Sequence, residues 1–101
     1  MVRTSRKKWT PEESRKEKEA LYADLEAGRL TLGQATRRMR KIVGLTQVEY
    51  AEKVLKIYPR VLMGIENDRG NPTLDTLEKI ARQFGLKVAF VRDRREALPS
   101  R

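Results

Sequence analysis

The stretch that decides the fold runs from Leu45 to Leu86 and reads LTQVEYAEKVLKIYPRVLMGIENDRGNPTLDTLEKIARQFGL. Short helix patterns follow one another along it: a Thr-Gln pair begins one helix, an Ile-Glu-Asn run ends another, and Asn-Pro-Thr-Leu begins the next. Thr is favoured at a helix start because its side chain accepts a hydrogen bond from a first-turn N–H group. Helices this short bury little surface alone, so they must pack on one another at steep angles. The stretch therefore predicts a small all-α domain.

The charge of the chain favours a polyanionic partner. Of the 101 residues, 23 are Lys or Arg and 14 are Asp or Glu, so the formal net charge is +9. The excess is spread along the chain rather than gathered in one block. A distributed positive field attracts nucleic acid. The alternative is a basic protein whose charges only keep it in solution.

The chain contains no Cys and no His. Disulfides, thiolate chemistry and the most common general base and zinc ligands are therefore excluded. We expect no catalytic site, no metal and no cofactor, since an enzyme would need an unmarked carboxylate site or a metal. No apolar run reaches the roughly 18 residues of a membrane span, and the polar start does not fit a signal peptide. We expect a cytoplasmic protein without a membrane partner.

Two helices are predicted ahead of the deciding stretch. Residues 1–9 form a basic arm, which either follows phosphate groups or is simply solvated. Thr10, followed by Pro and two Glu, predicts a capped helix that ends at Gly28 and docks through its second half, around Leu21–Leu25, on the core or on a partner. Thr31 predicts the next helix start, and Gly44 its end.

Apolar spacing within the deciding stretch identifies the residues expected to face the core. They are Val48, Ala51 and Val54 in its first helix, Val61 or Leu62 and Ile65 in its second, and Leu74, Leu77, Ile80, Ala81 and Phe84 in its third.

The apolar period changes after Gly85. The segment Leu86–Val91 reads LKVAFV and is rich in residues that favour strands. A single strand leaves its edge groups without partners, and the sequence offers no second strand. We therefore expect this strand to pair with its copy in a second subunit. The dimerisation residues would be Leu86, Val88, Phe90 and Val91, and the predicted divisions are residues 1–30, 31–85 and 86–101.

The residues from Thr31 to Leu86 resemble the Xre, or phage Cro/cI, type of helix-turn-helix repressor. The motifs that carry the resemblance are Thr46-Gln47, Ala51, Ile65-Glu66-Asn67, Asn71-Pro72-Thr73-Leu74 and Leu77. The resemblance implies an all-α, five-helix lambda-repressor-like domain, here with an N-terminal helical extension and a C-terminal strand. It also implies a homodimer that binds double-stranded DNA at a two-fold operator and represses transcription.

The strand after the helices is similar to the HipB-like antitoxin subgroup. This similarity implies an alternative function, an antitoxin that binds a toxin protein and regulates its own operon. The basic arm, the first helix or the tail at 92–101 would then hold the toxin.

The resemblance also assigns roles to residues. Base reading falls to Arg60, Tyr58 and Val61, and phosphate binding to Thr46, Gln47, Asn67, Arg69 and Asn71. Arg60 is the preferred base contact because a guanidinium can bond both O6 and N7 of guanine. Glu66 is expected to pair with a nearby Arg, because a carboxylate that faced DNA would be repelled.

Two features depart from the family pattern. The segment Val54–Ile57 is one residue longer than the usual turn and lacks its Gly, so the register of the recognition helix is open by one residue. Gly64 stands where a polar side chain is common, and it either allows close approach to a phosphate or means that few bases are read.

Overall fold

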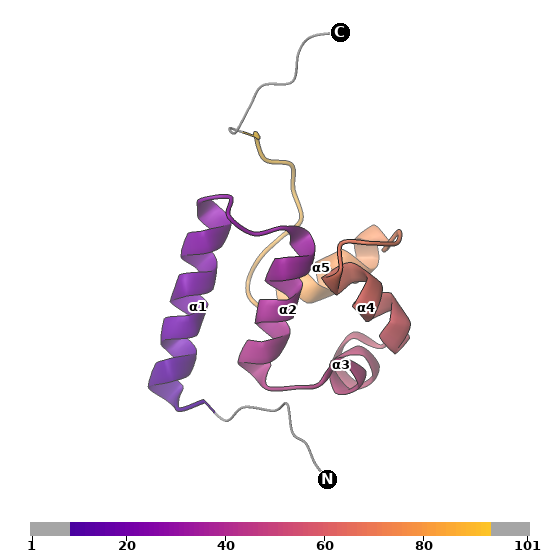
Figure 1. Ribbon diagram of the computed structural model, residues 1–101, viewed down its shortest axis with the longest axis horizontal. Helices are drawn as coiled ribbons and strands as arrows, with labels where there is room; N and C mark the ends of the chain where they lie inside the picture. The colour runs from indigo at the N-terminus through magenta and orange to yellow at the C-terminus, as the bar shows by residue number, and fades with distance from the viewer. Residues whose placement is uncertain (1–8, 94–101) are drawn as a thin grey trace, which may run out of the picture.

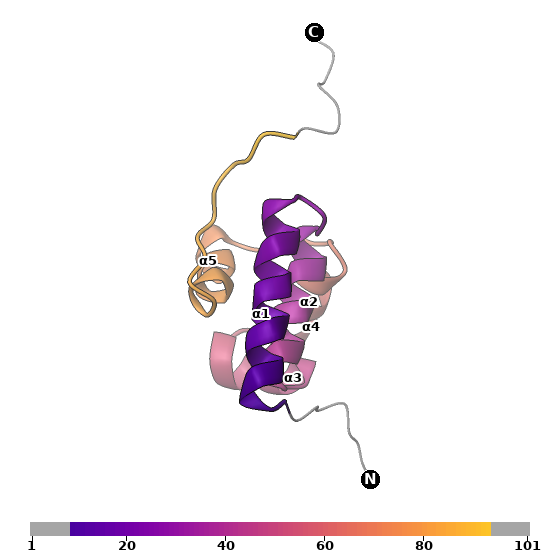
Figure 2. The same ribbon diagram turned by 90° about the vertical axis from the view of Figure 1, so that its left-hand side faces the viewer.

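The computed structural model describes residues 9–93, and the ends at 1–8 and 94–101, including the basic arm and most of the tail, lie outside the described residues. The elements are α1 (Pro11–Glu26), α2 (Leu32–Val43), α3 (Gln47–Glu49), the π-helical η1 (Tyr50–Leu55), α4 (Pro59–Glu66) and α5 (Leu74–Arg82). Within residues 9–93 there is no strand, and the predicted all-α class is confirmed. Figures 1 and 2 show α1 beside α2, with α3 and α4 on the other side of α2.

The predicted helix starts are confirmed by their hydrogen bonds. The Thr10 hydroxyl accepts from the Glu13 N–H at 3.0 Å, and the Glu13 carboxylate accepts from the Thr10 N–H at 3.0 Å. The same reciprocal capping box forms at Thr31 and at Thr46. Because each box satisfies N–H groups that the helix itself cannot, these short helices are held at defined first residues.

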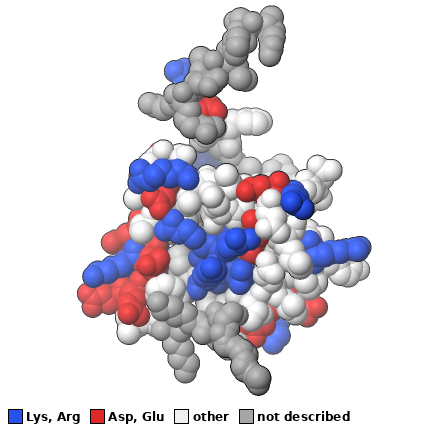
Figure 3. Space-filling model, viewed as in Figure 1, with Lys and Arg blue, Asp and Glu red and all other residues white. Residues whose placement is uncertain are grey.

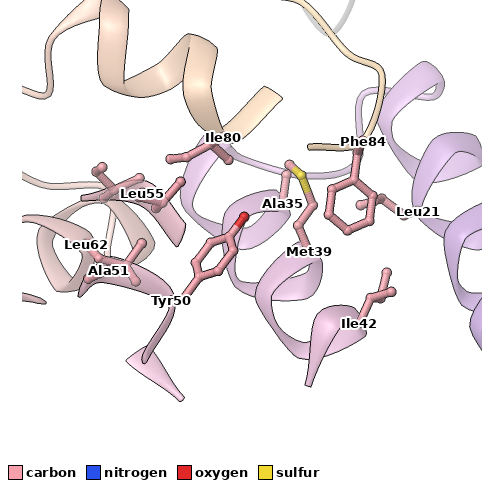
Figure 4. Close-up of a cluster of buried hydrophobic side chains, with 11 residues drawn as sticks. Leu21, Ala35, Met39, Ile42, Tyr50, Ala51, Leu55, Leu62, Ile80 and Phe84 are labelled. Atoms are coloured by element: carbon pink, nitrogen blue, oxygen red, sulfur yellow. The ribbon is translucent and has the colours of Figure 1, made fainter. Parts of the chain in front are cut away.

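One apolar core connects the helices (Figure 4). It contains Leu21 from α1, Ala35, Met39 and Ile42 from α2, Tyr50, Ala51 and Leu55 from η1, Leu62 and Ile65 from α4, and Ile80 and Phe84 from α5 and its end. Leu21 is fully buried, and the neighbouring Tyr22 hydroxyl donates to the Phe84 carbonyl at 2.9 Å. The expectation that the first helix docks around Leu21–Leu25 is confirmed, and its partner is the core of the same chain.

Two residues predicted to face the core do not. Val48 is 52% exposed and Leu74 is 59% exposed. Successive helical residues point about 100° apart, so Val48 turns outward because Gln47 turns inward, and Leu74 lies well away from the buried Thr76 and Ile80. Tyr50 and Leu55 of the following η1 are fully buried instead.

The hydroxyl of Tyr50 lies inside the core. Among residues 9–93 it is the buried side-chain polar atom without a hydrogen-bond partner. Burial, and then the nearby Glu66 carboxylate, raise the pKa of Tyr50 to about 12. The phenol therefore stays neutral at ordinary pH.

The long turn before α4 is built from η1. A π-helical turn closes on the fifth residue instead of the fourth, so it holds one more residue than an α-helical turn. Lys56 then adopts a left-handed conformation with φ 59°, the conformation for which Gly is usually selected, and the Ile57 N–H donates to the Ala51 carbonyl at 2.9 Å. The π-helical turn therefore ends at Leu55, shortly before α4 begins at Pro59; that this turn holds one residue more than the family's usual turn stays a prediction.

Beyond α5 the chain runs away from the helices up to residue 93 (Figure 1). Leu86 packs against the core of its own chain, whereas Val88, Phe90 and Val91 are 40%, 104% and 88% exposed. Residues 86–91 form no strand in the single chain. Because a strand is defined by its pairing, the expected partner strand of a second subunit stays a prediction.

None of the helices in the described part of the chain is both long and apolar enough to cross a membrane.

Candidate functional site

A buried carboxylate joins α2, α3 and α4. Glu66 ends α4 with a side chain that is 0% exposed, and Arg40 of α2 reaches it through Nε–Oε2 at 2.7 Å and Nη2–Oε1 at 3.1 Å. Such two-bond pairing fixes both groups in one geometry. The expected structural pairing of Glu66 with a nearby Arg is confirmed.

The surroundings of Glu66 keep it ionised. Burial pushes the pKa of Glu66 upward, but hydrogen bonds from Arg40, Gln47 and Arg37 outweigh burial and leave the pKa below its ordinary value. The carboxylate is therefore a negative charge at neutral pH, balanced mainly by the buried Arg40.

Gln47 is oriented by the same carboxylate. Its Nε2 donates to Glu66 Oε1 at 2.9 Å, which holds the side chain at the start of α3. An amide nitrogen carries two hydrogens, so this bond leaves Gln47 a second donor. Thr46, the residue before it, is engaged in capping α3 through Glu49.

Arg37 and Asn67 lie at the rim of this cluster. Arg37 Nη2 donates to Asn67 Oδ1 at 3.1 Å, and Arg37 Nε lies 3.5 Å from Glu66 Oε1. The Arg37 side chain is 43% exposed. A guanidinium has five donors, so Arg37 can hold these contacts and still present positive charge to solvent.

The other basic residues of α2 have separate roles. The Arg38 guanidinium binds Asp24 of α1 at 2.6 Å, and its hydrogen bond is the leading reason why the pKa of Asp24 lies below its ordinary value. Lys41 is exposed, and its carbonyl accepts from Trp9 Nε1 at 2.9 Å. Figure 3 shows Lys and Arg side chains gathered over the middle of one face, where Figure 1 places α2.

The register of α4 is fixed by its buried side. Leu62 and Ile65 face the core, so Arg60, two residues before Leu62, points outward. Tyr58 is the N-cap residue and is 74% exposed, with no capping bond from its side chain. Val61 is 36% exposed, and the structure adds Met63, 46% exposed, which the sequence did not single out. The sequence could have indicated the exposure of Met63, because a residue directly after a buried helical position points about 100° away from it.

The loop after α4 is held at both sides. Asp68 accepts from the Gly33 N–H and from the Thr31 hydroxyl, both at 2.8 Å, and the Arg69 N–H donates to the Gly64 carbonyl at 2.7 Å. A Cβ on Gly64 would lie 3.4 Å from the Arg69 carbonyl oxygen. Gly64 of α4 thus packs against the loop that follows the helix.

Each predicted phosphate residue lies at the surface or its edge. Asn67, Arg69 and Asn71 are exposed, and Thr46 and Gln47 are half-buried at the start of α3. The predicted dimerisation residues lie on the separate segment after α5.

An open hollow flanks the first turn of α4. Its volume is about 660 Å³, and it is lined by Glu52, Lys56, Ile57, Tyr58, Pro59, Val61, Asn71, Pro72, Thr73 and Thr76. No group of three or more acidic, Cys or His residues suited to a metal occurs within residues 9–93.

Comparison with known proteins places this geometry in a family. The family described as Helix-turn-helix matches residues 37–91. The Immunity repressor protein of Bacillus phage phi105 is 42% identical over 62 residues, which are 61% of this chain and 42% of that protein. The chain thus spans less than half the length of that relative. No solved structure matches the chain.

Proposed function

Because the chain belongs to the helix-turn-helix family, we propose that it binds duplex DNA through α3 and α4 and represses transcription. The observation that carries this proposal is the Gln47–Glu66 contact, which orients a donor at the start of α3 next to an α4 whose outer side is open. The phage phi105 relative is named an immunity repressor, which supports the same role. The net charge of +9 supports attraction to the DNA backbone.

The contacts divide into two kinds. Gln47, Asn67 and Arg37 around the buried Glu66 would bind phosphate groups, because their donors reach the surface from a rigid support. Thr46, Arg69 and Asn71 are the other residues to which we assign phosphate contacts. Phosphate contacts fix orientation but carry no sequence information directly. Base reading would fall to Arg60, with Tyr58 and Val61 beside it.

Selection from a random DNA pool tests the proposal. We expect a preferred duplex whose binding weakens by about 10³–10⁵ between 50 and 200 mM salt, if about 6–10 phosphates are neutralised. Arg60→Ala should cost about 1–3 kcal/mol and relax the preference at one base position. Arg82→Ala, an exposed Arg at the end of α5, is the control. The proposal fails if the pool yields no preferred sequence or if salt has no effect.

Arg37 and Arg38 offer a second, matched comparison. Both lie on α2, but Arg38 is paired with Asp24, away from Glu66. Arg37→Gln should reduce the slope of log K against log salt by about 0.9 for each subunit bound, whereas Arg38→Gln should not. Equal slopes in the two variants would show that Arg37 contacts no phosphate.

We further propose that the binding unit is a homodimer joined through residues 86–91. The exposed Val88, Phe90 and Val91 support this proposal, because three large apolar side chains within four residues are costly to leave in water. On a two-fold site the half-sites should lie about 34 Å apart. Light scattering of the full chain, of Phe90→Asp and of a chain ended after Lys87 tests it; the same number of subunits in all three would contradict it.

The antitoxin alternative, with its HipB-like strand and toxin partner, stays a prediction. In that case the segment 86–91 would still pair two subunits, and the toxin would be held by the basic arm, the first helix or the tail at 92–101. Co-purification with the protein encoded beside this one separates the two roles: a stable complex supports the antitoxin, and an isolated dimer that binds DNA supports the repressor alone.

A further inference from the structure

The outer side of α4 has an unusual chemical composition for base reading. Its exposed side chains are Arg60, Val61 and Met63, with Tyr58 just before the helix. The helix contains neither Asn nor Gln before its cap, and those amides are the groups that bond both N6 and N7 of adenine. Gly64 contributes no side chain. One guanidinium and several apolar groups are therefore what the first two turns offer to a major groove.

The apolar groups lie on both sides of Arg60. With Leu62 held in the core, the 100° step of the helix places Val61 on one side of Arg60 and Met63 on the other. Val61 and Tyr58 also line the open hollow, so their side of the helix has room for a partner's groups. An arginine flanked by apolar surface requires a ligand with the matching pattern.

The major groove contains one apolar group, the C5 methyl of thymine. We infer that α4 recognises thymine methyl groups next to a guanine, with Val61 and Met63 as the methyl contacts and Arg60 on the guanine. This inference rests on the proposed DNA binding and names the base edges that this site takes. The operator half-site should therefore hold at least one thymine adjoining the guanine read by Arg60.

Replacing thymine by deoxyuridine tests the inference from the DNA side. Deoxyuridine keeps the base pair and removes only the methyl group. In the duplex preferred by the unsubstituted chain, each thymine of the half-site is replaced in turn. Loss of one buried methyl corresponds to about a four-fold weaker binding, and to about fifteen-fold when both half-sites are changed.

The protein side tests which residue makes the contact. In Val61→Ala or Met63→Ala the matching deoxyuridine substitution should no longer weaken binding, because the methyl has already lost its partner. Val43→Ala is the control: Val43, at the end of α2, is 43% exposed, and its variant should keep the full deoxyuridine effect. Val61→Thr, which keeps the shape of Val, should retain part of it.

The outcomes separate this inference from the proposed function. If a preferred duplex exists and no thymine responds to deoxyuridine, the methyl contacts are refuted while DNA binding stands. If the deoxyuridine effect persists unchanged in both Val61→Ala and Met63→Ala, the methyl is read elsewhere and the inference is again refuted. If no duplex is preferred at all, both fall together. A deoxyuridine effect that disappears in one of the two variants supports the inference and identifies the residue.

Discussion

Replacing Glu66 with Gln should destabilise the domain more than any conservative change at its surface. The substitution keeps the shape of the side chain but removes its charge. Arg40, itself only 9% exposed, then stays buried without its counter-ion, and Gln47 and Arg37 lose a charged acceptor. A neutral amide oxygen still accepts one hydrogen bond, so the loss is smaller than for Glu66→Ala.

The magnitude follows from the burial of the pair. Removing one partner of a buried ion pair costs about 3–5 kcal/mol because the other charge stays desolvated. Taking the lower end for Gln gives about 3 kcal/mol, out of the roughly 5–15 kcal/mol that stabilise a typical domain. At about 4–8 °C per kcal/mol for a domain of this size, the Tm should fall by about 12–24 °C.

Thermal and urea unfolding followed by circular dichroism measure this change. Glu52→Gln is the control, since Glu52 is exposed on η1 and should change the free energy of unfolding by no more than about 0.5 kcal/mol. The double variant Arg40→Met/Glu66→Leu should recover most of the loss, because it removes both buried charges. A Glu66→Gln variant as stable as Glu52→Gln would show that the buried Arg40–Glu66 ion pair does not stabilise the domain as argued.

Three further predictions concern stability. The pKa of Glu66 is lower in the folded than in the unfolded chain, so its contribution to the free energy of unfolding is complete above about pH 4.3 and is lost as the pH falls further. Lowering the pH below this value should therefore reduce the free energy of unfolding of the native chain more than that of Glu66→Gln. Gly33→Ala should destabilise the domain by about 1–3 kcal/mol or more, because the added Cβ would lie 2.5 Å from the Ile65 carbonyl oxygen. Gly64→Ala, whose Cβ would lie 3.4 Å from its nearest neighbour, should stabilise the domain by up to about 1 kcal/mol. Thermal melts in which both variants shift the Tm in the same direction would contradict this. Deleting the exposed Lys53 should convert the π turn to an α turn, and the chain should keep the helical circular-dichroism spectrum of the native fold. Deleting Lys79 should rotate the buried end of α5 by about 100°, and the chain should lose that spectrum.

Local chemistry made much of this fold predictable from the sequence. Thr10, Thr31 and Thr46 each have their capping partner three residues later, and such bonds depend on neighbours in the chain alone. The pairing of Glu66 with an Arg was also predictable, because a lone carboxylate on a DNA-facing side would be repelled. The sequence did not select Arg40 among four basic residues of α2, since the choice depends on how α2 crosses α4.

The errors arose where tertiary contacts rotate a helix. Val48 and Leu74 both fit an apolar spacing, yet each stands in the first turn of its helix, where two or three residues cannot define a face. In α3 the decisive interaction is polar, from Gln47 to Glu66, and a hydrophobic pattern does not contain it. Met63 was missed for a different reason: the sequence left open whether Val61 or Leu62 faces the core, and the exposure of Met63 follows from the burial of Leu62.

The π-helical turn before α4 determines how α3 and α4 meet. Gln47 and Glu66 must meet across the turn, and a residue inserted into a regular α-helix would rotate everything after it by 100°. With the π turn in η1 and a left-handed Lys56, a conformation that favours Gly, Gln47 Nε2 lies 2.9 Å from Glu66 Oε1. If the turn holds one residue more than the family's usual turn, the π turn is where that residue would be accommodated. The donor proposed for phosphate and the helix proposed for the bases are therefore coupled through one buried carboxylate. A change that shifts α4 relative to α3 should weaken phosphate contact and base reading together, whereas a change on the outer side of α4 should alter base preference alone.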